Sequence, residues 1–394
     1  MTSARGSEGF LNSVRDALDG CVAALGAQRW FRDKGREVRD LAVLDVVPVE
    51  RAQSSLLLLS LVRWDFERGS SSVYLVPWVV SSSESLELVE DASCVVDELL
   101  RLCEESGELR GSAGSIRGFG FRDIDRSPAR PLGVEQSNDG FVCGDHTFVK
   151  LYRKVESGAN VEAEMLGFLS SKPGVAPVPR LLATFDYIEL DGRAWCLGLA
   201  QEFASGYGDA WEVTTSALRE YVGGGKGDEL TRLVRGVAKL TAIMHGFLVG
   251  CAGDVSEPPS IAKAILSKAR ELSESSDQVD GLPERCERAL ASLSARRWPR
   301  IRAHGDYHLG QVLVSRDHFL AVDFEGEPGL PLAERRVAQP VARDVAGMLR
   351  SFHYAAAVAS QGSDSKTLNY ALRWAESASA EFLDVYRAEM ESSE

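Results

Sequence analysis

The sequence lacks the cysteine pattern of a disulfide-rich or zinc-binding protein. Its seven cysteines are scattered over 394 residues, their number is odd, and no two of them form a CxxC pair. A disulfide framework needs paired cysteines, and a zinc knuckle needs closely spaced ones. We therefore expect free thiols in a reducing cytoplasm, without a disulfide scaffold or a structural zinc ion.

A long apolar run and an excess of basic residues are also missing. The first residues, MTSARGSEGF, contain no apolar signal core, and the most apolar run, Leu56 to Val62, is too short to span a bilayer. The chain has 44 basic and 58 acidic residues, which gives a net charge of −14. Because nucleic acids and anionic lipid surfaces attract basic proteins, we expect neither as a partner. A monomer is favoured over an oligomer.

The sequence does contain an ordered succession of helix-like and strand-like segments. Helical spacing of apolar residues predicts a helix over 9–26, and three apolar runs between 41 and 80 predict an antiparallel meander. The next predicted segments are a helix over 91–105, a looser stretch with a linker over 106–131, two strands joined at Gly144-Asp145 over 141–155, a helix over 159–170 and strands over 178–203. From about 210 helices dominate, at 227–249, 260–274, 283–294 and 366–391, around one strand-like island at 310–325.

The sharpest chemical signal is HGDYHLGQVLVSRDHFLAVDFEGEP, at residues 304–328. Asp306 is followed five positions later by the amide Gln311, and Asp323 ends an apolar run before Phe324. Protein kinases use the same logic, in which a loop carboxylate accepts a hydroxyl proton while an amide and a strand-end carboxylate hold magnesium. The HGD triplet alone is a weak signal, and the full combination carries the prediction. We therefore predict phosphoryl transfer from ATP with Mg²⁺.

A second signal lies upstream, in FVCGDHTFVKLYRK. Lys150 stands on a predicted strand just after a turn, where its ammonium group can reach the α- and β-phosphates of ATP. That role needs a helix-borne carboxylate, and Glu164, or alternatively Glu162, lies on the next predicted helix. Taken alone, Lys150 is more typical of an ordinary edge-strand lysine. Beside the 304–328 segment, the phosphate role is favoured.

The segment 136–140 is a turn-rich loop between two predicted strands. Its backbone amides and small side chains, including Ser137 and Asn138, are suited to cover phosphates. The sequence has neither a G-x-G-x-x-G loop nor a Walker A motif. The phosphate role of this loop therefore depends on its position before Lys150.

At these residues the sequence resembles actinobacterial maltokinases, within the broader aminoglycoside-phosphotransferase-like kinases, and a related actinobacterial group with the same motifs resembles glucosamine kinases. The matching pieces are QRWFRDKGRE, EQSNDG, VKLYRKVESGANVEAE, LAQEF, HGDYHLGQVL, DFEGEPGLPLAERR and ARDVAGMLRSFHYAA. They cover nearly the whole chain. The resemblance implies an α+β, bilobal protein-kinase-like fold: an N-terminal cap at 1–90, a β-rich intermediate subdomain completing the N-lobe at 91–203, and a mostly helical C-lobe with the catalytic loop at 204–394.

Carried over residue by residue, the resemblance assigns roles across the nucleotide site. It implies that Asp306 is the catalytic base and that Gln311 and Asp323 are magnesium ligands. It also implies that Lys150 binds the phosphates. It further implies that Glu325 assists the metal ion and that Glu164 is the partner of Lys150. The chain from Gln201 to Phe203 matches the hinge, whose backbone reads adenine. Tyr307 departs from the family pattern, which more often has an aliphatic residue there.

Candidate acceptor contacts each have a structural alternative. His308 flanks the base, and a role in holding the loop is favoured over acid–base work. Arg343 and Asp344 open a predicted helix, where an ion-paired cap and a sugar contact are both open interpretations. Trp211, in GYGDAWE, offers an aromatic face to a sugar, and core packing is its alternative.

The predicted acceptor is glucosamine, which would give glucosamine 6-phosphate. The carboxylates of Asp209, Glu212 and Asp344 would pair with its protonated amine, and the chain is short for a maltokinase. The alternatives are a maltokinase that makes maltose 1-phosphate, an aminoglycoside-type antibiotic kinase, and a nucleotide-binding pseudokinase. Pseudokinases typically lose the base or a metal ligand, whereas this sequence keeps both. The DFEGEP and RDVAGMLRSF blocks resemble sugar kinases more than antibiotic kinases.

Overall fold

The computed structural model describes residues 7–51, 56–67, 69–81, 85–105, 107–133, 138–251, 261–275, 281–294, 300–327 and 329–392. The chain divides into two compact units. We call residues 1–171 and 179–206 the N-terminal unit, and residues 172–178 and 207–394 the C-terminal unit. The seven cysteines are free thiols. Within the described ranges, no helix has the length and apolar character needed to cross a bilayer.

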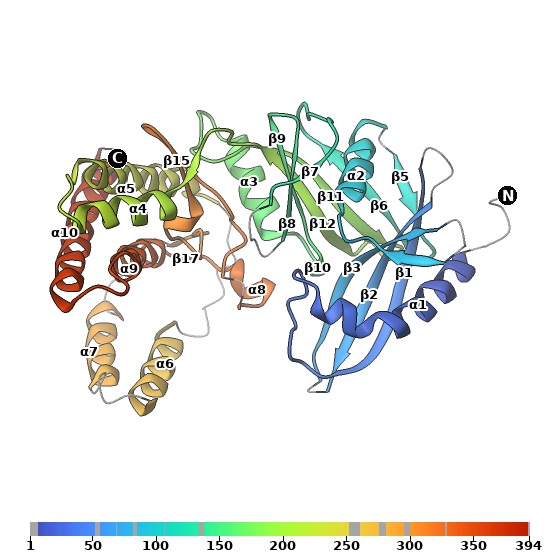
Figure 1. Cartoon of the computed structure of the whole chain (residues 1–394), viewed down its shortest axis with the longest axis horizontal. Helices are drawn as coiled ribbons and strands as arrows, with labels where there is room; N and C mark the ends of the chain where they lie inside the picture. Colours follow the sequence, from blue (N-terminus) through green and yellow to red (C-terminus); the bar gives the residue numbers. More distant parts are fainter. Residues whose placement is uncertain are drawn as a thin grey trace. The chain divides into compact units, whose positions relative to one another are not determined.

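The N-terminal unit begins with a helix lying on a small antiparallel sheet (Figure 1). The predicted helix and meander are confirmed as α1 (Ser7–Ala27) and the strands β1 (Val38–Glu50), β2 (Leu56–Phe66) and β3 (Ser71–Val80). Two short strands, β4 (Leu86–Leu88) and β10 (Lys154–Val155), pair with β3. Apolar residues of α1, such as Leu18, share a core with strand residues, such as Trp64 and Tyr74, and with Phe31 from the segment between α1 and β1. This burial holds the helix on the sheet.

A second sheet, of seven strands, forms the rest of this unit, with helices α2 (Ser93–Glu105) and α3 (Val161–Ser171). Its strand order is β5-β6-β11-β12-β9-β8-β7. The members are β5 (Glu108–Arg110), β6 (Gly114–Gly120), β7 (Arg130–Pro131), β8 (Asp139–Cys143), β9 (Thr147–Leu151), β11 (Leu181–Glu189) and β12 (Ala194–Glu202). The hairpin predicted around Gly144-Asp145 is confirmed as β8–β9.

The linker predicted within 106–131 is wrong for the stretch 108–120, which forms β5 and β6. Its glycines serve close packing. A Cβ atom at Gly118 would lie 2.9 Å from the Sγ atom of Cys103 on α2, so only glycine lets β6 approach that helix. A glycine-rich stretch that packs in this way looks like a linker when only composition is considered.

The C-terminal unit is mainly helical, as predicted. Its long helices are α4 (Ala210–Val222), α5 (Asp228–Leu248), α6 (Ile261–Ser275), α7 (Leu282–Ser294), α9 (Ala342–Ala359) and α10 (Ser365–Glu391). The island at 310–325 is confirmed as the hairpin β15 (Val312–Ser315) and β16 (His318–Ala321), to which β13 (Gly208–Asp209) is added. A second pair is β14 (Arg300–Ile301) with β17 (Gln339–Pro340), and α8 (Leu332–Arg335) is a single turn.

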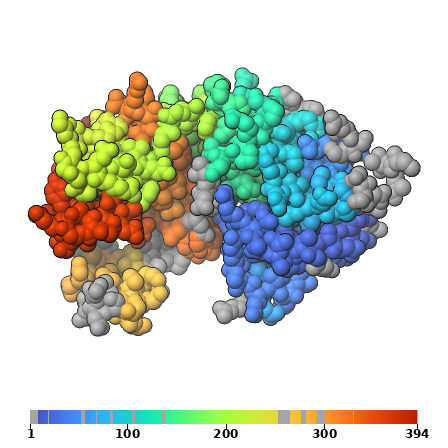
Figure 2. Space-filling view, viewed as in Figure 1, coloured from blue at the N-terminus to red at the C-terminus, as the bar shows by residue number. Residues whose placement is uncertain are grey.

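Helix α10 is held along its length by α5 and α9. It starts at the N-cap residue Asp364, whose side chain accepts a 2.8 Å hydrogen bond from the backbone N–H of Thr367. Its buried face includes Phe382, which meets Phe352 of α9 edge-on at 5.9 Å between ring centroids. On the visible face of this unit, α4 and α10 form adjoining surfaces (Figure 2).

Candidate active site

In the N-terminal unit, Lys150 of β9 is buried against helix α3. Its Nζ atom donates a 2.9 Å hydrogen bond to Oε2 of Glu162, which also accepts a 2.8 Å hydrogen bond from the hydroxyl of Tyr152. Asn160 caps the helix by accepting from the N–H of Ala163 at 2.9 Å, which fixes the first turn and places Glu162 toward the sheet. The ammonium group is therefore held in one position by a buried carboxylate.

The structure changes the choice of partner for Lys150 from Glu164 to Glu162, the alternative considered. Helix α3 begins at Val161, and its buried side includes Glu162, Met165 and Leu166, whereas Glu164 is only partly buried. Positions two apart on a helix point about 200° apart, so only one of the two carboxylates can face β9. The sequence would have indicated Glu162 if the first residue of helix α3 could have been predicted to within one position.

This pairing can be tested with two matched variants on the same helix. We expect Glu162→Gln to weaken ATP binding by about tenfold or more, because a charged hydrogen bond worth about 1.5–3 kcal/mol no longer holds Lys150. Glu164→Gln removes the same charge two residues away and should leave the affinity within about twofold. Nucleotide titration calorimetry on both variants measures the difference. A larger loss in Glu164→Gln would return the role to Glu164.

The predicted hinge, Gln201 to Phe203, ends strand β12 in the same unit. Two of its backbone N–H groups are already used, because Glu202 donates to the carbonyl of Arg180 at 3.0 Å and Phe203 donates to that of His146 at 2.8 Å. The N–H of Ala204 has no hydrogen-bond partner among the described residues. Of the backbone donors at the end of this predicted hinge, the N–H of Ala204, one residue beyond the predicted range, is thus open to a ligand.

The predicted phosphate loop is only partly described. Ser137 lies outside the described residues. Asn138 is buried, and its Oδ1 atom accepts a 2.7 Å hydrogen bond from the guanidinium group of Arg32. One end of the loop is thus fixed by a residue of the QRWFRDKGRE segment.

In the C-terminal unit, Asp306 lies on a loop whose backbone is held by Asp344 of α9. The two carboxylate oxygens of Asp344 accept 2.9 Å hydrogen bonds from the N–H groups of His304 and Gly305. One oxygen also lies 3.2 Å from Nε2 of His245. Burial raises the pKa of Asp344. The hydrogen bond from His245 and its charge lower the pKa by more than burial raises it, so the pKa lies below its ordinary value.

Asp344 is therefore not a sugar contact. Its side chain is 1% exposed, so an acceptor cannot reach it, and it positions the two residues before Asp306. Glycine at 347 permits this approach of α9, because a Cβ atom there would lie 2.4 Å from the carbonyl oxygen of Tyr307. Tyr307 itself is buried, and its hydroxyl accepts a hydrogen bond from Thr241 at 3.1 Å. Tyr307, which stands where related kinases more often have an aliphatic residue, therefore has a hydrogen-bond partner for its hydroxyl in the core.

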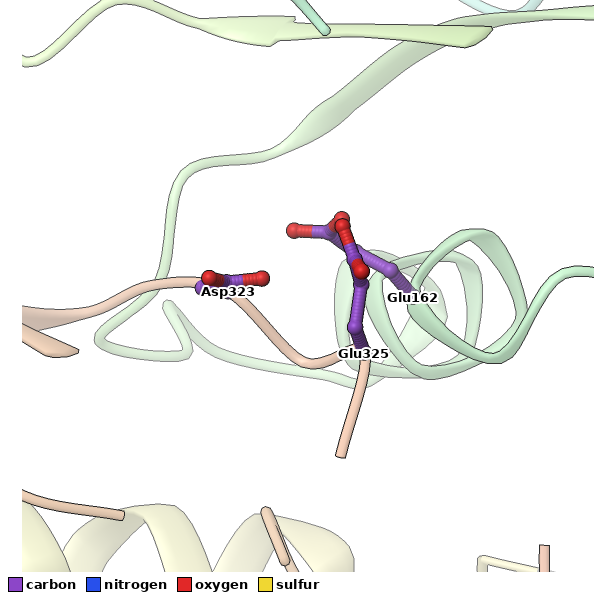
Figure 3. Close-up of side chains that lie close together, drawn as sticks. All are labelled: Glu162, Asp323 and Glu325. Carbon is purple, nitrogen blue, oxygen red and sulfur yellow. The ribbon is translucent and has the colours of Figure 1, made fainter. Parts of the chain in front are cut away.

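The predicted metal ligands flank the β15–β16 hairpin: Gln311 ends the short 3-10 helix η3 (Leu309–Gln311) before it, and Asp323 and Glu325 lie on the loop after it. The Nε2 atom of Gln311 lies 3.4 Å from Oδ2 of Asp323, and Asp323 and Glu325 have carboxylate oxygens within 4.8 Å of each other (Figure 3). Asp323 has φ +66°, a left-handed conformation that is uncommon outside glycine and concentrates at functional sites. Phe324 anchors this turn, because its ring packs 4.6 Å from that of His304.

These donors fit magnesium. An amide and two carboxylates are hard oxygen ligands, and Mg²⁺ is usually held by one or two carboxylates together with phosphate oxygens and water. The side chain of Glu325 is nearly buried, while Asp323 is partly exposed. Gln311 presents its oxygen when its nitrogen faces Asp323, an assignment that rests on the hydrogen bond between them.

His308 has a defined hydrogen-bonding role beside the base. Its Nδ1 atom accepts a 3.1 Å hydrogen bond from the N–H of Gly310, which caps the short 3-10 helix η3 (Leu309–Gln311). Burial lowers the pKa of His308, although the charge of Asp306 opposes this. Because Nδ1 accepts the hydrogen bond of Gly310, the uncharged ring in this arrangement carries its proton on Nε2. The structural role favoured for His308 agrees with this contact.

The remaining candidate acceptor contacts differ in their burial and in their hydrogen bonds. Asp209 is the N-cap of α4: its Oδ1 atom accepts from the N–H groups of Trp211 at 2.7 Å and Glu212 at 3.3 Å. Trp211 is partly buried and Glu212 is exposed. Arg343 donates to the side chains of Gln339 and, at 2.6 Å, Glu327. Only Asp209 combines partial burial with a second oxygen, Oδ2, that has no partner among the described residues.

Comparison with known proteins shows which sequences this chain is similar to. A model described as "Phosphotransferase enzyme family" matches residues 128–326, and one described as "Maltokinase N-terminal cap domain" matches residues 25–98. A glucosamine kinase from Streptacidiphilus jiangxiensis is 26% identical over 272 residues, which cover 66% of this chain and 61% of that protein. One from Mycolicibacterium smegmatis is 26% identical over 248 residues, covering 58% and 60%. The chain thus spans about three fifths of these relatives.

The fold is also similar to that of solved glucosamine kinase structures. A glucosamine kinase in complex with glucosamine, ADP and inorganic phosphate superposes with a TM-score of 0.68 at 19% identity, covering 94% of this chain and 88% of that one. A second crystal form gives a TM-score of 0.69. The expected α+β, kinase-like fold is confirmed. Because the phosphotransferase model spans just over half of the 394 residues, this chain belongs to the phosphotransferase enzyme family.

Proposed function

We propose that this protein is an ATP-dependent sugar kinase that transfers the γ-phosphoryl group of ATP to glucosamine, giving glucosamine 6-phosphate. The observation that carries the proposal is the loop in which Asp344 fixes the backbone before Asp306, next to Gln311 and Asp323. Family membership supports phosphotransfer, and the similarity to two glucosamine kinases supports the acceptor.

In this proposal Asp306 accepts the proton of the acceptor hydroxyl as its oxygen attacks the γ-phosphorus. The new O–P bond forms as the bond from the γ-phosphorus to the bridging oxygen breaks, and ADP leaves with that electron pair. Asp306 then carries the proton, which passes to solvent. Magnesium, when bound, neutralises charge on the triphosphate. Gln311, Asp323 and Glu325 would hold it.

The N-terminal unit would bind the nucleotide. Lys150, kept in place by Glu162, donates to the α- and β-phosphates. The N–H of Ala204 donates to adenine. Little covalent chemistry is left for the protein, so positioning and charge stabilisation provide most of the rate.

Selectivity for an amino sugar is assigned to Asp209. Of the three carboxylates predicted to pair with the amine, Asp344 is used by the catalytic loop and Glu212 is exposed, where solvent screens an ion pair. Asp209 is partly buried, and this burial raises its pKa above the ordinary value of 3.8. A charged hydrogen bond that the ammonium group of the sugar donates to Oδ2 would favour glucosamine over glucose.

The acceptor is tested by measuring ADP release with glucosamine, glucose, N-acetylglucosamine, maltose and an aminoglycoside under identical conditions. We expect kcat/KM for glucosamine to exceed that for glucose by about 10–150-fold, the worth of a charged hydrogen bond of about 1.5–3 kcal/mol. Asp209→Asn should remove most of this preference while keeping the helix cap, because asparagine caps as well as aspartate. Turnover of glucose serves as the internal control.

A second candidate is a maltokinase, favoured by the match of residues 25–98 to the maltokinase cap. Best turnover with maltose would reject the glucosamine proposal in its favour. Preference for the aminoglycoside would indicate an antibiotic kinase. Magnesium-dependent nucleotide binding without turnover of any acceptor would indicate a pseudokinase.

A further inference from the structure

Arg153 is a fully buried arginine whose two terminal nitrogens have no hydrogen-bond partner in the part of the chain that the structure describes. Its side chain is 1% exposed, and neither NH1 nor NH2 has a hydrogen bond among the described residues. The charge of Arg153 is paired with Asp139 through Nε, but buried N–H donors that lack an acceptor are unfavourable. The four N–H bonds at these nitrogens therefore need an acceptor from outside the described residues.

The terminal nitrogens NH1 and NH2, which we call the Arg153 fork, are held in a fixed direction by contacts of the rest of the side chain. Its Nε atom donates a 2.7 Å hydrogen bond to Oδ2 of Asp139, and the group lies over the indole ring of Trp30 at 5.2 Å from the ring centroid. The backbone carbonyl of Arg153 accepts from the N–H of Leu75 at 2.7 Å. Strand β3, the start of β8 and the segment around Trp30 thus all hold the same residue.

Local charge favours an anion at this place. The hydrogen-bonded residues around this place include four cations, Arg32, Arg36, Arg153 and Lys154, and two carboxylates, Asp33 and Asp139. Asp33 is already engaged, because it accepts from Tyr74 at 2.6 Å, Arg36 at 2.8 Å and Lys154 at 3.0 Å. Although burial raises its pKa, these hydrogen bonds lower the pKa to about 2, so Asp33 is a carboxylate committed to other donors. Two positive charges remain in excess.

This fork does not belong to the nucleotide side of the sheet. In the β8–β9 hairpin, Asp139 is opposite Leu151 and Gly140 is opposite Lys150. Side chains of directly opposed residues share a face, and successive residues alternate between faces. Asp139, which holds Arg153, therefore lies on the opposite face from Lys150. An anion at the Arg153 fork would be separate from the phosphates that Lys150 contacts.

We infer that Arg153 forms a buried binding site for a small oxyanion, on the face of the β8–β9 hairpin opposite Lys150 and beside Trp30. Carboxylate and phosphate oxygens match a guanidinium fork bidentately, so the ligand is an anion of this class. Because Trp30, β3 and β8 meet at Arg153, an anion bound there links the α1-side segment to the hairpin that carries Lys150. The inference does not depend on the proposed function.

Thermal unfolding in matched ionic strength tests the site. Phosphate, sulfate, acetate and chloride are compared at 10 mM to about 50 mM with the whole chain. We expect phosphate or sulfate to raise Tm by about 2–4 °C relative to chloride. Arg153→Met should lose that increment, and Arg63→Met, which removes a partly exposed arginine of strand β2 that is paired with Asp65, should keep it. Binding of phosphate on the Lys150 face would remain in both variants, so the difference reports Arg153.

The experiment also distinguishes loss of the anion site from loss of folding. Replacing a buried charge with an apolar side chain is often neutral or stabilising, so we expect Arg153→Met to fold. Should it not fold, Arg153→Lys keeps the charge without the fork and should bind phosphate at least tenfold more weakly. Crystals soaked in selenate should show an anomalous peak at NH1 and NH2 of Arg153. Equal anion effects in wild type and Arg153→Met, or selenate peaks only elsewhere, would overturn the inference. An acetate effect without a phosphate effect would assign the site to carboxylates.

Discussion

Asp306→Asn should lower turnover by about 10²–10⁴-fold while the protein stays folded. Asparagine cannot accept the hydroxyl proton, yet it has nearly the same shape as aspartate. The fold should tolerate it, because Asp306 is only partly buried and forms no hydrogen bond with the described residues. The loop backbone is held instead by Asp344. The loss should therefore appear in kcat, with ATP affinity and Tm close to wild type.

Single-turnover phosphate transfer and an unfolding curve together measure this effect. Asp323→Asn is the matched comparison, because it makes the same chemical change at a predicted metal ligand. It should raise the magnesium concentration needed for half-maximal activity, whereas Asp306→Asn should leave that concentration unchanged. Near-wild-type turnover in Asp306→Asn would reject Asp306 as the base.

Asp344→Asn should cost both stability and activity. Asparagine keeps one acceptor oxygen, but its amide nitrogen would face the backbone N–H of His304 or Gly305. Removing one partner of a buried charged network costs about 3–5 kcal/mol, and the loop that carries Asp306 loses its anchor. We expect a fall in turnover of about tenfold or more, because misplacement by about 1 Å costs on the order of 10²-fold. Arg343→Gln, at the neighbouring residue, is the control for damage to the start of α9.

The pH dependence distinguishes this loss from a general one. The pKa of Asp344 in the folded protein lies below its ordinary value of 3.8. Its ionised form therefore contributes stability above the unfolded-state pKa, and this contribution disappears as the pH falls through the folded-state pKa. Wild type and Asp344→Asn should differ most near neutral pH and converge in strong acid. A difference in unfolding free energy that is constant from pH 7 to below pH 3 would contradict the charged network.

Much of the site could be predicted because catalytic chemistry restricts residue type and spacing. Asp306, Gln311 and Asp323 lie on one short segment, so their relation is local and can be seen in the chain order. Lys150 was identifiable for the same reason, as a lysine after a turn on a strand. The choice of Glu162 over Glu164 needed the start of helix α3 to within one residue, and helix starts are uncertain by more than that in a sequence.

Chain order alone predicted the candidate catalytic segment, most of the succession of strands and helices, and the family, because each depends on residues close in sequence. Tertiary structure decided what depends on distant partners. His245, Asp344 and the loop at 304–305 come from three separate segments, and nothing local marks Asp344 as an anchor instead of a sugar contact. Burial also decided that Glu212 is exposed and Asp209 is not, and it left the fork of Arg153 without a partner. Burial and hydrogen-bond satisfaction are properties of the packed chain, and the sequence of one segment does not contain them.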